Sequence, residues 1–327
     1  NSGRFIGKKD HEQNSLKINL EASREIARQL RLRDIGGLVV IDYIDLQEAV
    51  NRKKVHNELF EHLKWIQMEG ISPNKSDLFP TVLTGKGKKI LLIHGFDSCF
   101  LEYRRLTPFL SKNNKLIIPD LYGFGFCPRS SGNKYGFKYL IKHLNSMLDY
   151  FSKDQPIGVI GASMGGALAL ELARRNPKKI NKLLLLSPAG LAGKNPKIPW
   201  PFNHLGAFFL SQPFVRRGLC RQAFADPTKS VGPAEEQIAS IHLKVPGWQS
   251  SLAAFAADGG VSNCGLPKPT QPLKIILGKY DRIIPKNEKE ETSKTYNSNI
   301  EIATNSGHLP HLEEPKLVAE AWANLKV

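Results

Sequence analysis

Apolar residues recur in short blocks along most of the chain, and polar or mixed stretches separate these blocks. Compact apolar runs of about five residues are typical of strands that are buried on both faces of a sheet. The longer stretches between them carry apolar residues at helical spacing. The pattern predicts strands at 89–93, 116–119, 157–161, 183–187, 273–277 and 300–304, and helices near 101–111, 135–151, 163–176, 286–298 and 313–325. This alternation predicts an α/β fold with a mostly parallel sheet and helices on both faces.

The segment between Ser187 and Leu273 is too long for a simple loop in a compact domain. We therefore expect an inserted helical lid at about 191–264. Most of its large apolar side chains are expected to pack the lid onto the core, and a subset could line an apolar pocket. These residues are Trp200, Phe202, Leu205, Phe208, Phe209, Leu210, Phe214, Val215, Leu219, Phe224, Trp248, Leu252 and Phe255.

The first 64 residues form a separate pattern. A helical run is expected at about 15–33, a strand at 38–45 and a polar helix at about 46–64. This pattern predicts a small α/β fragment at 1–64 ahead of a larger domain at 65–327. Because no Gly/Ser-rich or Pro-rich spacer lies at the seam, the two parts are expected to be either a natural fusion or an artificial join.

One short motif carries the clearest chemical signal. It reads GASMG, with its serine at Ser163, and lies between a predicted strand and a predicted helix. A serine flanked by small residues at such a junction is typical of a nucleophile elbow, in which a sharp turn exposes the hydroxyl. The alternative is an ordinary serine at the start of a helix, a position that serine favours.

A serine nucleophile needs a base to remove its proton and a carboxylate to fix the tautomer of that base. Asp281 follows the predicted strand 273–277, and His308 follows the strand 300–304. Because parallel strands gather their carboxyl ends at one edge of the sheet, these side chains are expected to meet Ser163. His311 competes with His308 as the base, and a neighbouring carboxylate competes with Asp281.

Together these motifs resemble the α/β-hydrolase family over residues 65–327. The likeness includes a GHLP sequence at 307–310 and a DLYGFG turn at 120–125. It implies that Ser163 is the nucleophile, that His308 is the general base and then the acid, and that Asp281 orients His308.

The resemblance also implies an oxyanion hole made by the backbone N–H groups of Phe96 and Met164. It implies no cofactor and no metal. The neighbouring His94 is expected to be a buried ring that hydrogen-bonds to the backbone. Asp97 and Asp120 are expected to stabilise turns.

Residues 25–46, EIARQLRLRDIGGLVVIDYIDL, resemble the ribonuclease E/G family. That family cuts RNA with a magnesium ion held by two aspartates near an asparagine. The resemblance matches Asp42 to the second aspartate and Asn1 to the asparagine, and it places the first aspartate two residues before Asn1. The family's S1-like domain and Cys-Pro-x-Cys zinc motif are absent from the sequence. We therefore expect no nuclease activity and no nucleic-acid partner.

The composition of the chain further limits the classes of protein to which it can belong. The chain has 327 residues and a net charge of +16. Its lysines are dispersed, which predicts a solvated surface with weak membrane contact at most. No apolar run approaches the roughly 18 residues that span a bilayer, and the first residues do not resemble a signal peptide. Four scattered cysteines (Cys99, Cys127, Cys220 and Cys264) predict free thiols in a reducing cytoplasm.

These observations predict a serine hydrolase that cleaves an ester or thioester with an apolar part through an acyl-enzyme. Hydrolysis of a carbon–carbon bond by the same triad is the first alternative. A catalytically silent binding protein and a remnant of a magnesium-dependent ribonuclease are the others. A serine nucleophile argues against dehalogenase or epoxide hydrolase chemistry, in which a carboxylate forms the ester.

Overall fold

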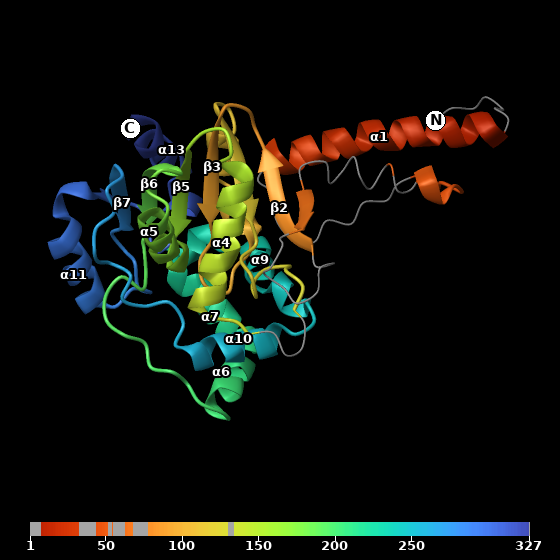
Figure 1. Ribbon diagram of the computed structural model, residues 1–327. Coiled ribbons are helices and arrows are strands. Elements are labelled where there is room, and N and C mark those ends of the chain that lie inside the picture. Colours follow the sequence, from red (N-terminus) through yellow and green to blue (C-terminus); the bar gives the residue numbers. More distant parts are fainter. Residues whose placement is uncertain are drawn as a thin grey trace.

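The computed structural model of the chain describes residues 8–32, 44–51, 54, 63–67, 78–129 and 134–326 (Figure 1). Its centre is an eight-stranded sheet with the order β1-β2-β4-β3-β5-β6-β7-β8. Strands β3 to β8 are parallel, whereas β2 is antiparallel to both of its neighbours, β1 and β4. The strands are β1 Leu63–Gln67, β2 Leu78–Thr84, β3 Lys88–Ile93, β4 Asn114–Pro119, β5 Ile157–Ala162, β6 Ile180–Leu186, β7 Leu273–Gly278 and β8 Ile300–Ala303.

Helices cover both faces of this sheet. In Figure 1, α4 and α5 lie over one face, and α13 lies near the C-terminus. The core helices and 3-10 turns are η1 Phe100–Tyr103, α3 Thr107–Leu110, α4 Phe137–Phe151, α5 Met164–Arg175, α11 Lys286–Tyr296, η3 Asn297–Asn299, α12 Pro310–Glu313 and α13 Pro315–Asn324. The predicted fold class, a mostly parallel sheet with helices on both faces, is confirmed.

The apolar runs form central strands because both faces of the sheet are buried. Along β3, Leu91 and Ile93 face one hydrophobic cluster that contains α4 and α5. The alternate residues Ile90 and Leu92 face a second cluster, which α3 and α13 complete. Side chains alternate between the faces of a strand, so a strand packed on both sides requires a continuous apolar run.

The insert between β6 and β7 is helical, as predicted. Its elements are α6 Phe202–Ser211, α7 Pro213–Ala223, α8 Pro227–Ser230, α9 Pro233–Ile241, η2 His242–Lys244 and α10 Trp248–Asp258. Helices α6 and α10 pack together through the inward-facing Asn203, whose side-chain amide donates to the carbonyl oxygen of Ala253 at 3.2 Å. We call this insert the lid. It lies at one end of the molecule, with α6 at its tip (Figure 1).

The structure differs from several sequence-based boundaries. Strand β2 was not predicted, and β1 begins at Leu63, inside the predicted helix 46–64 and across the predicted seam at 64/65. The expected helix 101–111 is two short elements, η1 and α3, and the expected helix 313–325 is α12 followed by α13. Pro315 explains the second break, because proline disfavours a helical conformation in the residue before it, and Glu314 has φ −127° and ψ 56°.

Near the N-terminus, the helix α1 spans Lys8–Leu32, so it begins earlier than the predicted 15–33. The Asn19 side chain of α1 pairs with the backbone of Ile44, donating to its carbonyl oxygen at 2.8 Å and accepting from its N–H at 3.1 Å. Most of the predicted strand 38–45 lies outside the described residues, while Ile44 and Asp45 have no regular secondary structure. Asn1 and Asp42, which resemble metal-binding positions, also lie outside the described residues.

Candidate active site

Ser163 occupies the sharp turn between β5 and α5. Its backbone has φ 51° and ψ −122°, a conformation that side chains other than glycine rarely adopt. The turn also brings α5 very close to β3. A Cβ atom added to Gly165 would lie 2.1 Å from the carbonyl oxygen of Ile93. The small residues of the GASMG sequence are therefore needed for this strained turn.

Three side chains that are distant in sequence form one hydrogen-bonded chain at the carboxyl edge of the sheet. Nε2 of His308 lies 2.9 Å from Oγ of Ser163. Nδ1 of the same ring lies 2.9 Å from Oδ2 of Asp281. His308 and Asp281 are both buried. The structure therefore brings Ser163, Asp281 and His308 together, as the sequence predicted.

Asp281 is held in place by the loop that follows β7. The backbone N–H groups of Ile283 and Ile284 donate to its Oδ1 at 2.8 and 3.1 Å, which leaves Oδ2 for His308. Burial by itself raises the pKa of Asp281. The hydrogen bond with His308, together with those from the two N–H groups, outweighs burial and brings that pKa below its usual value. Asp281 is thus ionised beside the imidazole at neutral pH.

His311, the alternative base, lies elsewhere. It is fully buried at the start of α12, and its Nε2 lies 3.4 Å from Oε1 of Glu102. Both oxygens of Glu102 accept from the Gly95 N–H, at 3.2 and 3.1 Å. Burial raises the pKa of Glu102, but the contact with His311 lowers it overall. His311 and Glu102 therefore support the turn after β3 and do not contact Ser163.

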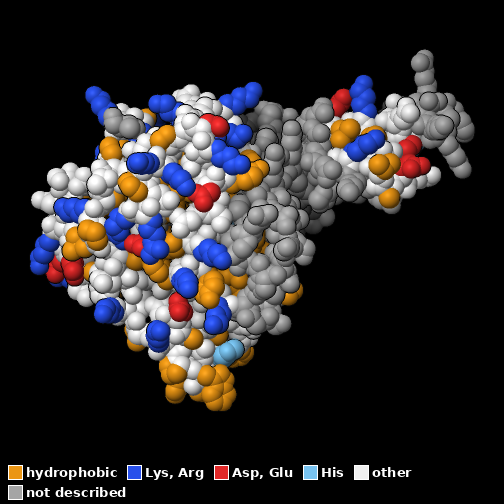
Figure 2. All heavy atoms as spheres, in the orientation of Figure 1, with side chains coloured by type: hydrophobic (Ala, Val, Ile, Leu, Met, Phe, Trp, Pro, Cys, Tyr) orange, Lys and Arg blue, Asp and Glu red, His pale blue; other side chains and the backbone are white. Residues whose placement is uncertain are grey.

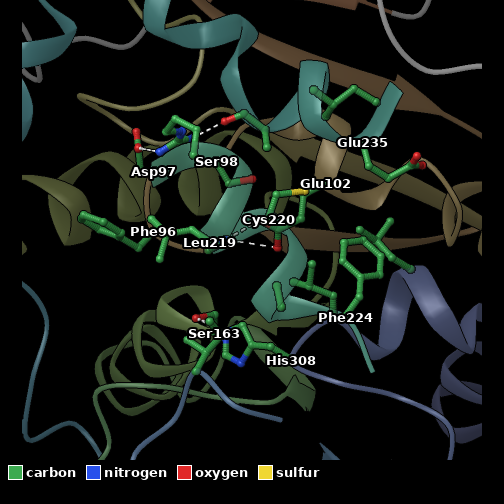
Figure 3. Close-up of a pocket in the computed structure, with 18 of the residues that line it drawn as sticks. Phe96, Asp97, Ser98, Glu102, Ser163, Leu219, Cys220, Phe224, Glu235 and His308 are labelled. Atoms are coloured by element: carbon green, nitrogen blue, oxygen red, sulfur yellow. Dashed lines mark hydrogen bonds and ion pairs between the residues drawn. The ribbon is translucent and has the colours of Figure 1, made fainter. Parts of the chain in front are cut away.

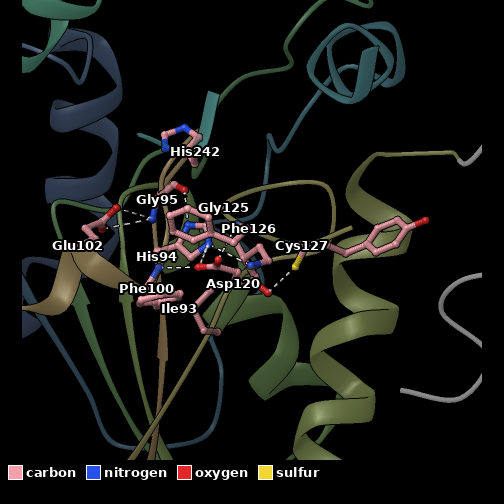
Figure 4. A network of polar contacts seen from close by, with 12 residues as sticks. Ile93, His94, Gly95, Phe100, Glu102, Asp120, Gly125, Phe126, Cys127 and His242 are labelled. Carbon is pink, nitrogen blue, oxygen red and sulfur yellow. Dashed lines mark hydrogen bonds and ion pairs between the residues drawn. The ribbon is translucent and has the colours of Figure 1, made fainter. Parts of the chain in front are cut away.

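The turn after β3 is fixed by buried polar contacts (Figure 4). Nε2 of His94 accepts from the Leu121 N–H at 3.0 Å, so Nδ1 carries the proton and donates to the Gly95 carbonyl oxygen at 2.8 Å. Burial lowers the pKa of His94, which keeps the ring neutral. The expected role of His94, a buried ring bonded to the backbone, is confirmed.

Asp120 joins this turn to the one after β4. Its two oxygens accept from the N–H groups of Phe100 and Phe126, both at 2.6 Å. Burial raises the pKa of Asp120 to about 7. Its expected function in stabilising a turn agrees with these bonds.

Asp97 has a further role that the sequence did not reveal, because it ties the turn after β3 to the lid. Oδ1 of this buried carboxylate accepts from Nε1 of Trp248 at 2.8 Å and lies 3.0 Å from Nε2 of His242. Oδ2 pairs with Arg216 at 2.5 Å. Burial raises the pKa of Asp97, but these three lid residues lower it overall. The partners are more than 100 positions away, so no local motif could have indicated them.

A cavity of about 260 Å³ opens beside Ser163 and His308 (Figure 3). In Figure 3 these two residues lie at one end of the cavity, and Asp97 and Glu235 lie toward the other. The core side contributes the turn after β3 and the loops of Ile283 and His308. The lid contributes mostly apolar side chains, namely Leu210, Leu219, Ala223, Phe224, Ile238 and Ala239.

Charged residues of the cavity wall are largely paired with one another. Glu235 accepts from Arg104 at 3.1 Å and from Arg105 at 2.8 Å, and Arg216 pairs with Asp97. One polar atom of these residues is unpaired: Nε of Arg216 is buried and has no hydrogen-bond partner among the described residues. A buried donor without a partner is costly, and burial keeps this atom away from the open space of the cavity.

The two predicted oxyanion donors belong to the two turns that meet at Ser163. Met164 is the first residue of α5, and the first N–H groups of a helix lack acceptors within it. Phe96 lies in the turn after β3, where the neighbouring Gly95 would place a Cβ 3.2 Å from that of Ser163. The Phe96 ring packs against Phe124 and Phe255, with centroid distances of 5.9 and 5.8 Å.

Comparison with known proteins identifies the class. The Alpha/beta hydrolase family matches residues 90–321, so the chain belongs to this family. The Ribonuclease E/G family matches residues 1–67, which identifies the N-terminal part as a segment of that family. Both resemblances seen in the sequence are therefore confirmed.

Individual proteins of known name or structure are also similar to this chain. The chain is 27% identical over 272 residues to 2-hydroxy-6-oxo-2,4-heptadienoate hydrolase of Pseudomonas putida, covering 75% of this chain and 89% of that protein. The crystal structure of a meta-cleavage product hydrolase, CumD, matches with a TM-score of 0.64 and 21% identity over 81% of this chain and 99% of that one. An esterase from Exiguobacterium antarcticum matches with a TM-score of 0.64 and 19% identity over 80% and 97%. These structural matches show the fold.

Three further observations concern metal binding, membrane helices and the cysteines. Among the described residues, no group of three or more His, Cys, Asp or Glu side chains is arranged to hold a metal ion. In the same part of the chain, no helix has the length and apolar character needed to cross a membrane. All four cysteines are free.

Proposed function

We propose that this chain is a serine hydrolase in which Ser163, His308 and Asp281 act as a catalytic triad. The observation that carries the proposal is their hydrogen-bonded chain, with both contacts of His308 at 2.9 Å. His308 takes the proton of Ser163 as its oxygen attacks a carbonyl carbon. Asp281 holds the ring in the required tautomer and stabilises the imidazolium that forms.

The N–H groups of Phe96 and Met164 would bind the oxyanion that develops on the substrate carbonyl. Both residues belong to turns that buried contacts hold rigidly, and preorganised donors of this kind cost no reorganisation during the reaction. The resulting acyl-enzyme would then react with a water molecule that His308 activates, which frees the acid and regenerates Ser163.

For the substrate, we propose a carbon–carbon bond next to a ketone in an acidic molecule. The Pseudomonas putida relative is named for a 2-hydroxy-6-oxo-dienoate. In the 2-oxo tautomer of such a compound, the departing carbon can spread its electron pair onto the 2-oxo group, and His308 can then supply a proton. Arg216 lines the cavity, so the carboxylate of the substrate would lie near this guanidinium, which also pairs with Asp97.

Hydrolysis of an ester or thioester is the second candidate, and the lid wall of the cavity favours it. That wall is mainly aliphatic and aromatic, which suits an uncharged apolar acyl or alcohol group. The same triad and oxyanion donors would serve either reaction, because both begin with attack of Ser163 on a carbonyl carbon.

Two assays on one protein sample distinguish these reactions. A fluorophosphonate probe should label the wild-type protein, and labelling should disappear in Ser163→Ala while persisting in Ser298→Ala, which alters an exposed serine. Turnover is then compared between 2-hydroxy-6-oxo-2,4-heptadienoate and p-nitrophenyl butyrate. Faster cleavage of the dienoate supports the carbon–carbon reaction, whereas cleavage of the ester alone supports the second candidate. Absence of labelling in a folded sample would contradict both and favour a binding protein.

A further inference from the structure

The lid carries an unusual apolar surface on the side that faces away from the core. On α6, the exposed positions Phe202, Leu205, Phe208 and Phe209 recur at helical spacing and so share one face. Trp200 precedes this helix, and Phe214 of α7 packs edge-on against Phe209 at a centroid distance of 6.1 Å. These six side chains are 55% to 78% exposed. We call them the aromatic face.

The aromatic face is outside the site described above. Helix α6 uses Asn203 and Ala207, on its opposite side, to pack against the rest of the lid. An ordinary surface helix directs polar residues outward, whereas this one directs aromatic rings outward. Figure 2 shows hydrophobic side chains gathered at the protruding end of the molecule where Figure 1 places α6. A large exposed apolar patch on a folded protein marks an interaction site.

The charges around the aromatic face indicate what it meets. Residues 198–215 contain no Asp, Glu, Lys or Arg, and residues 172–225 contain no Asp or Glu. Cations flank the uncharged stretch on both sides. Lys194, Lys197 and Arg221 are exposed, and no ion pair of theirs is found within the described part of the chain. The partner must therefore combine an apolar interior with a negatively charged surface.

An anionic lipid bilayer has both properties. We propose that the aromatic face docks on the surface of an anionic membrane, with its rings at the level of the headgroups and the flanking cations beside lipid phosphates. Tryptophan and phenylalanine on one face of a helix, with basic residues around them, are typical of interfacial binding. Each basic residue near an anionic membrane adds an attraction worth about a fivefold gain in binding.

A second copy of the chain is a weaker candidate. A symmetric contact through the aromatic face would bring Lys197 and Arg221 of both copies together, and residues 172–225 offer no acidic partner. Such like charges repel across an interface. The protruding shape of the lid tip in Figure 2 also suits partial insertion into a soft surface.

Docking in this way would also place the cavity near the bilayer. Leu210, the residue after Phe209 on α6, lines the cavity that contains Ser163. If the chain is a hydrolase as proposed, its substrate could then enter from the membrane. This consequence rests on the proposed function, but the docking itself does not.

The test is sedimentation of the full chain with sucrose-loaded vesicles. Vesicles of phosphatidylcholine with about one third phosphatidylglycerol should carry the protein down, whereas vesicles of phosphatidylcholine alone should bind it much less. Raising the salt concentration should weaken binding, because salt screens exposed charges. Ser163→Ala should bind like the wild type, which separates this result from any failure of the proposed hydrolase.

Two variants test the aromatic face and its charges. Phe202→Gln/Phe208→Gln should lower binding at least about tenfold, whereas Phe109→Gln/Tyr150→Gln, which removes two exposed aromatic residues outside the lid, should not. Lys197→Gln/Arg221→Gln should lower binding at least about fivefold, whereas Lys86→Gln/Lys286→Gln, an equal loss of charge at exposed positions elsewhere, should have little effect.

Tryptophan fluorescence of the wild-type protein tests the same contact without depending on how the variants fold. Brominated lipids should quench the fluorescence of Trp200 on binding, and Trp200→Phe should lose this quenching. Failure of the wild-type protein to bind anionic vesicles would overturn the proposal. So would equal binding by Phe202→Gln/Phe208→Gln and the wild type. A dimer in solution that this variant converts to a monomer, without any vesicle binding, would instead assign the face to a second copy.

Discussion

The core and the lid form opposite walls of one cavity, but they hold their side chains in different ways. On the core side, Ser163 is strained into a left-handed conformation, and buried partners surround His308 and Asp281. On the lid side, the cavity wall is mostly apolar, and the outer surface of α6 is exposed and aromatic. The difference suggests that the core positions the reacting groups and that the lid determines which substrates bind in the cavity.

The largest effect that we predict on the core side follows from changing the carboxylate that orients His308. Asp281→Asn keeps the size of the side chain but replaces an acceptor with an amide that can favour the wrong tautomer of His308. We expect kcat/KM to fall by about 10⁴-fold, measured on whichever substrate the wild type turns over. The control Asp154→Asn, which alters an exposed carboxylate, should stay within about twofold of the wild type. Comparable activity in Asp281→Asn would show that another carboxylate orients His308.

The connection between the two regions can be tested through Asp97. Asp97→Ala leaves Arg216, His242 and Trp248 without their buried acceptor. Removing one partner of a buried ion pair costs about 3 to 5 kcal/mol, so the free energy of unfolding in urea should fall by about that amount.

The matched control for Asp97 is Glu236→Ala. Its pair with Arg217 also belongs to the lid, but the side chains are 28% and 63% exposed. Exposed pairs contribute at most about 1 kcal/mol. Equal losses in Asp97→Ala and Glu236→Ala would show that the lid is not fastened to the core through Asp97.

The same two regions show what could be predicted from the sequence. The central strands and the GASMG turn were predictable because burial on both faces demands apolar runs and a strained turn demands small residues. The parallel order of the strands then implied that Asp281 and His308 would meet Ser163, as the structure shows. The antiparallel strands β1 and β2 were missed, since neither contains a compact apolar run.

Contacts between core and lid could not be predicted in this way. Asp97 meets Arg216, His242 and Trp248 across separations of 119, 145 and 151 residues. Each partner is a single residue on its own element, so no spacing or periodicity marks it. The expectation that most large apolar residues of the lid pack it onto the core is wrong, since those of the aromatic face are exposed. A helical pattern gives the spacing of a face but not the side to which it points.

The core should also be more sensitive to acid than the lid. Nδ1 of the buried His143 accepts from the Tyr122 N–H at 3.1 Å, and burial lowers the pKa of His143 from 6.5 to about 3. Between these values the unfolded chain binds more protons at this position than the folded chain, so stability falls as the pH is lowered through this range. The loss is about 1 kcal/mol over the first pH unit below 6.5 and approaches about 1.4 kcal/mol over the next unit.

His143→Asn can keep the acceptor for Tyr122 while removing this titration. In urea unfolding at pH 6.5 and 5.5, the loss of stability on acidification should be about 1 kcal/mol smaller in the variant than in the wild type. His204→Asn, which alters an exposed histidine on α6, should keep the wild-type pH dependence. Identical pH dependence in all three proteins would contradict a neutral, buried His143.

The smallest expected effect concerns selection by the lid. Leu219 lines the cavity from α7 and is 39% exposed, so Leu219→Ala should remove apolar contact with the substrate without unfolding the protein. Each buried methylene contributes about 0.8 kcal/mol. We therefore expect a loss of about fivefold in kcat/KM for a substrate with a long apolar acyl part, and little change for one with an acetyl group. Leu266→Ala, at an exposed position outside this cavity, should affect neither substrate. A uniform loss for short and long substrates in Leu219→Ala would indicate that this part of the lid supports the triad rather than the choice of substrate.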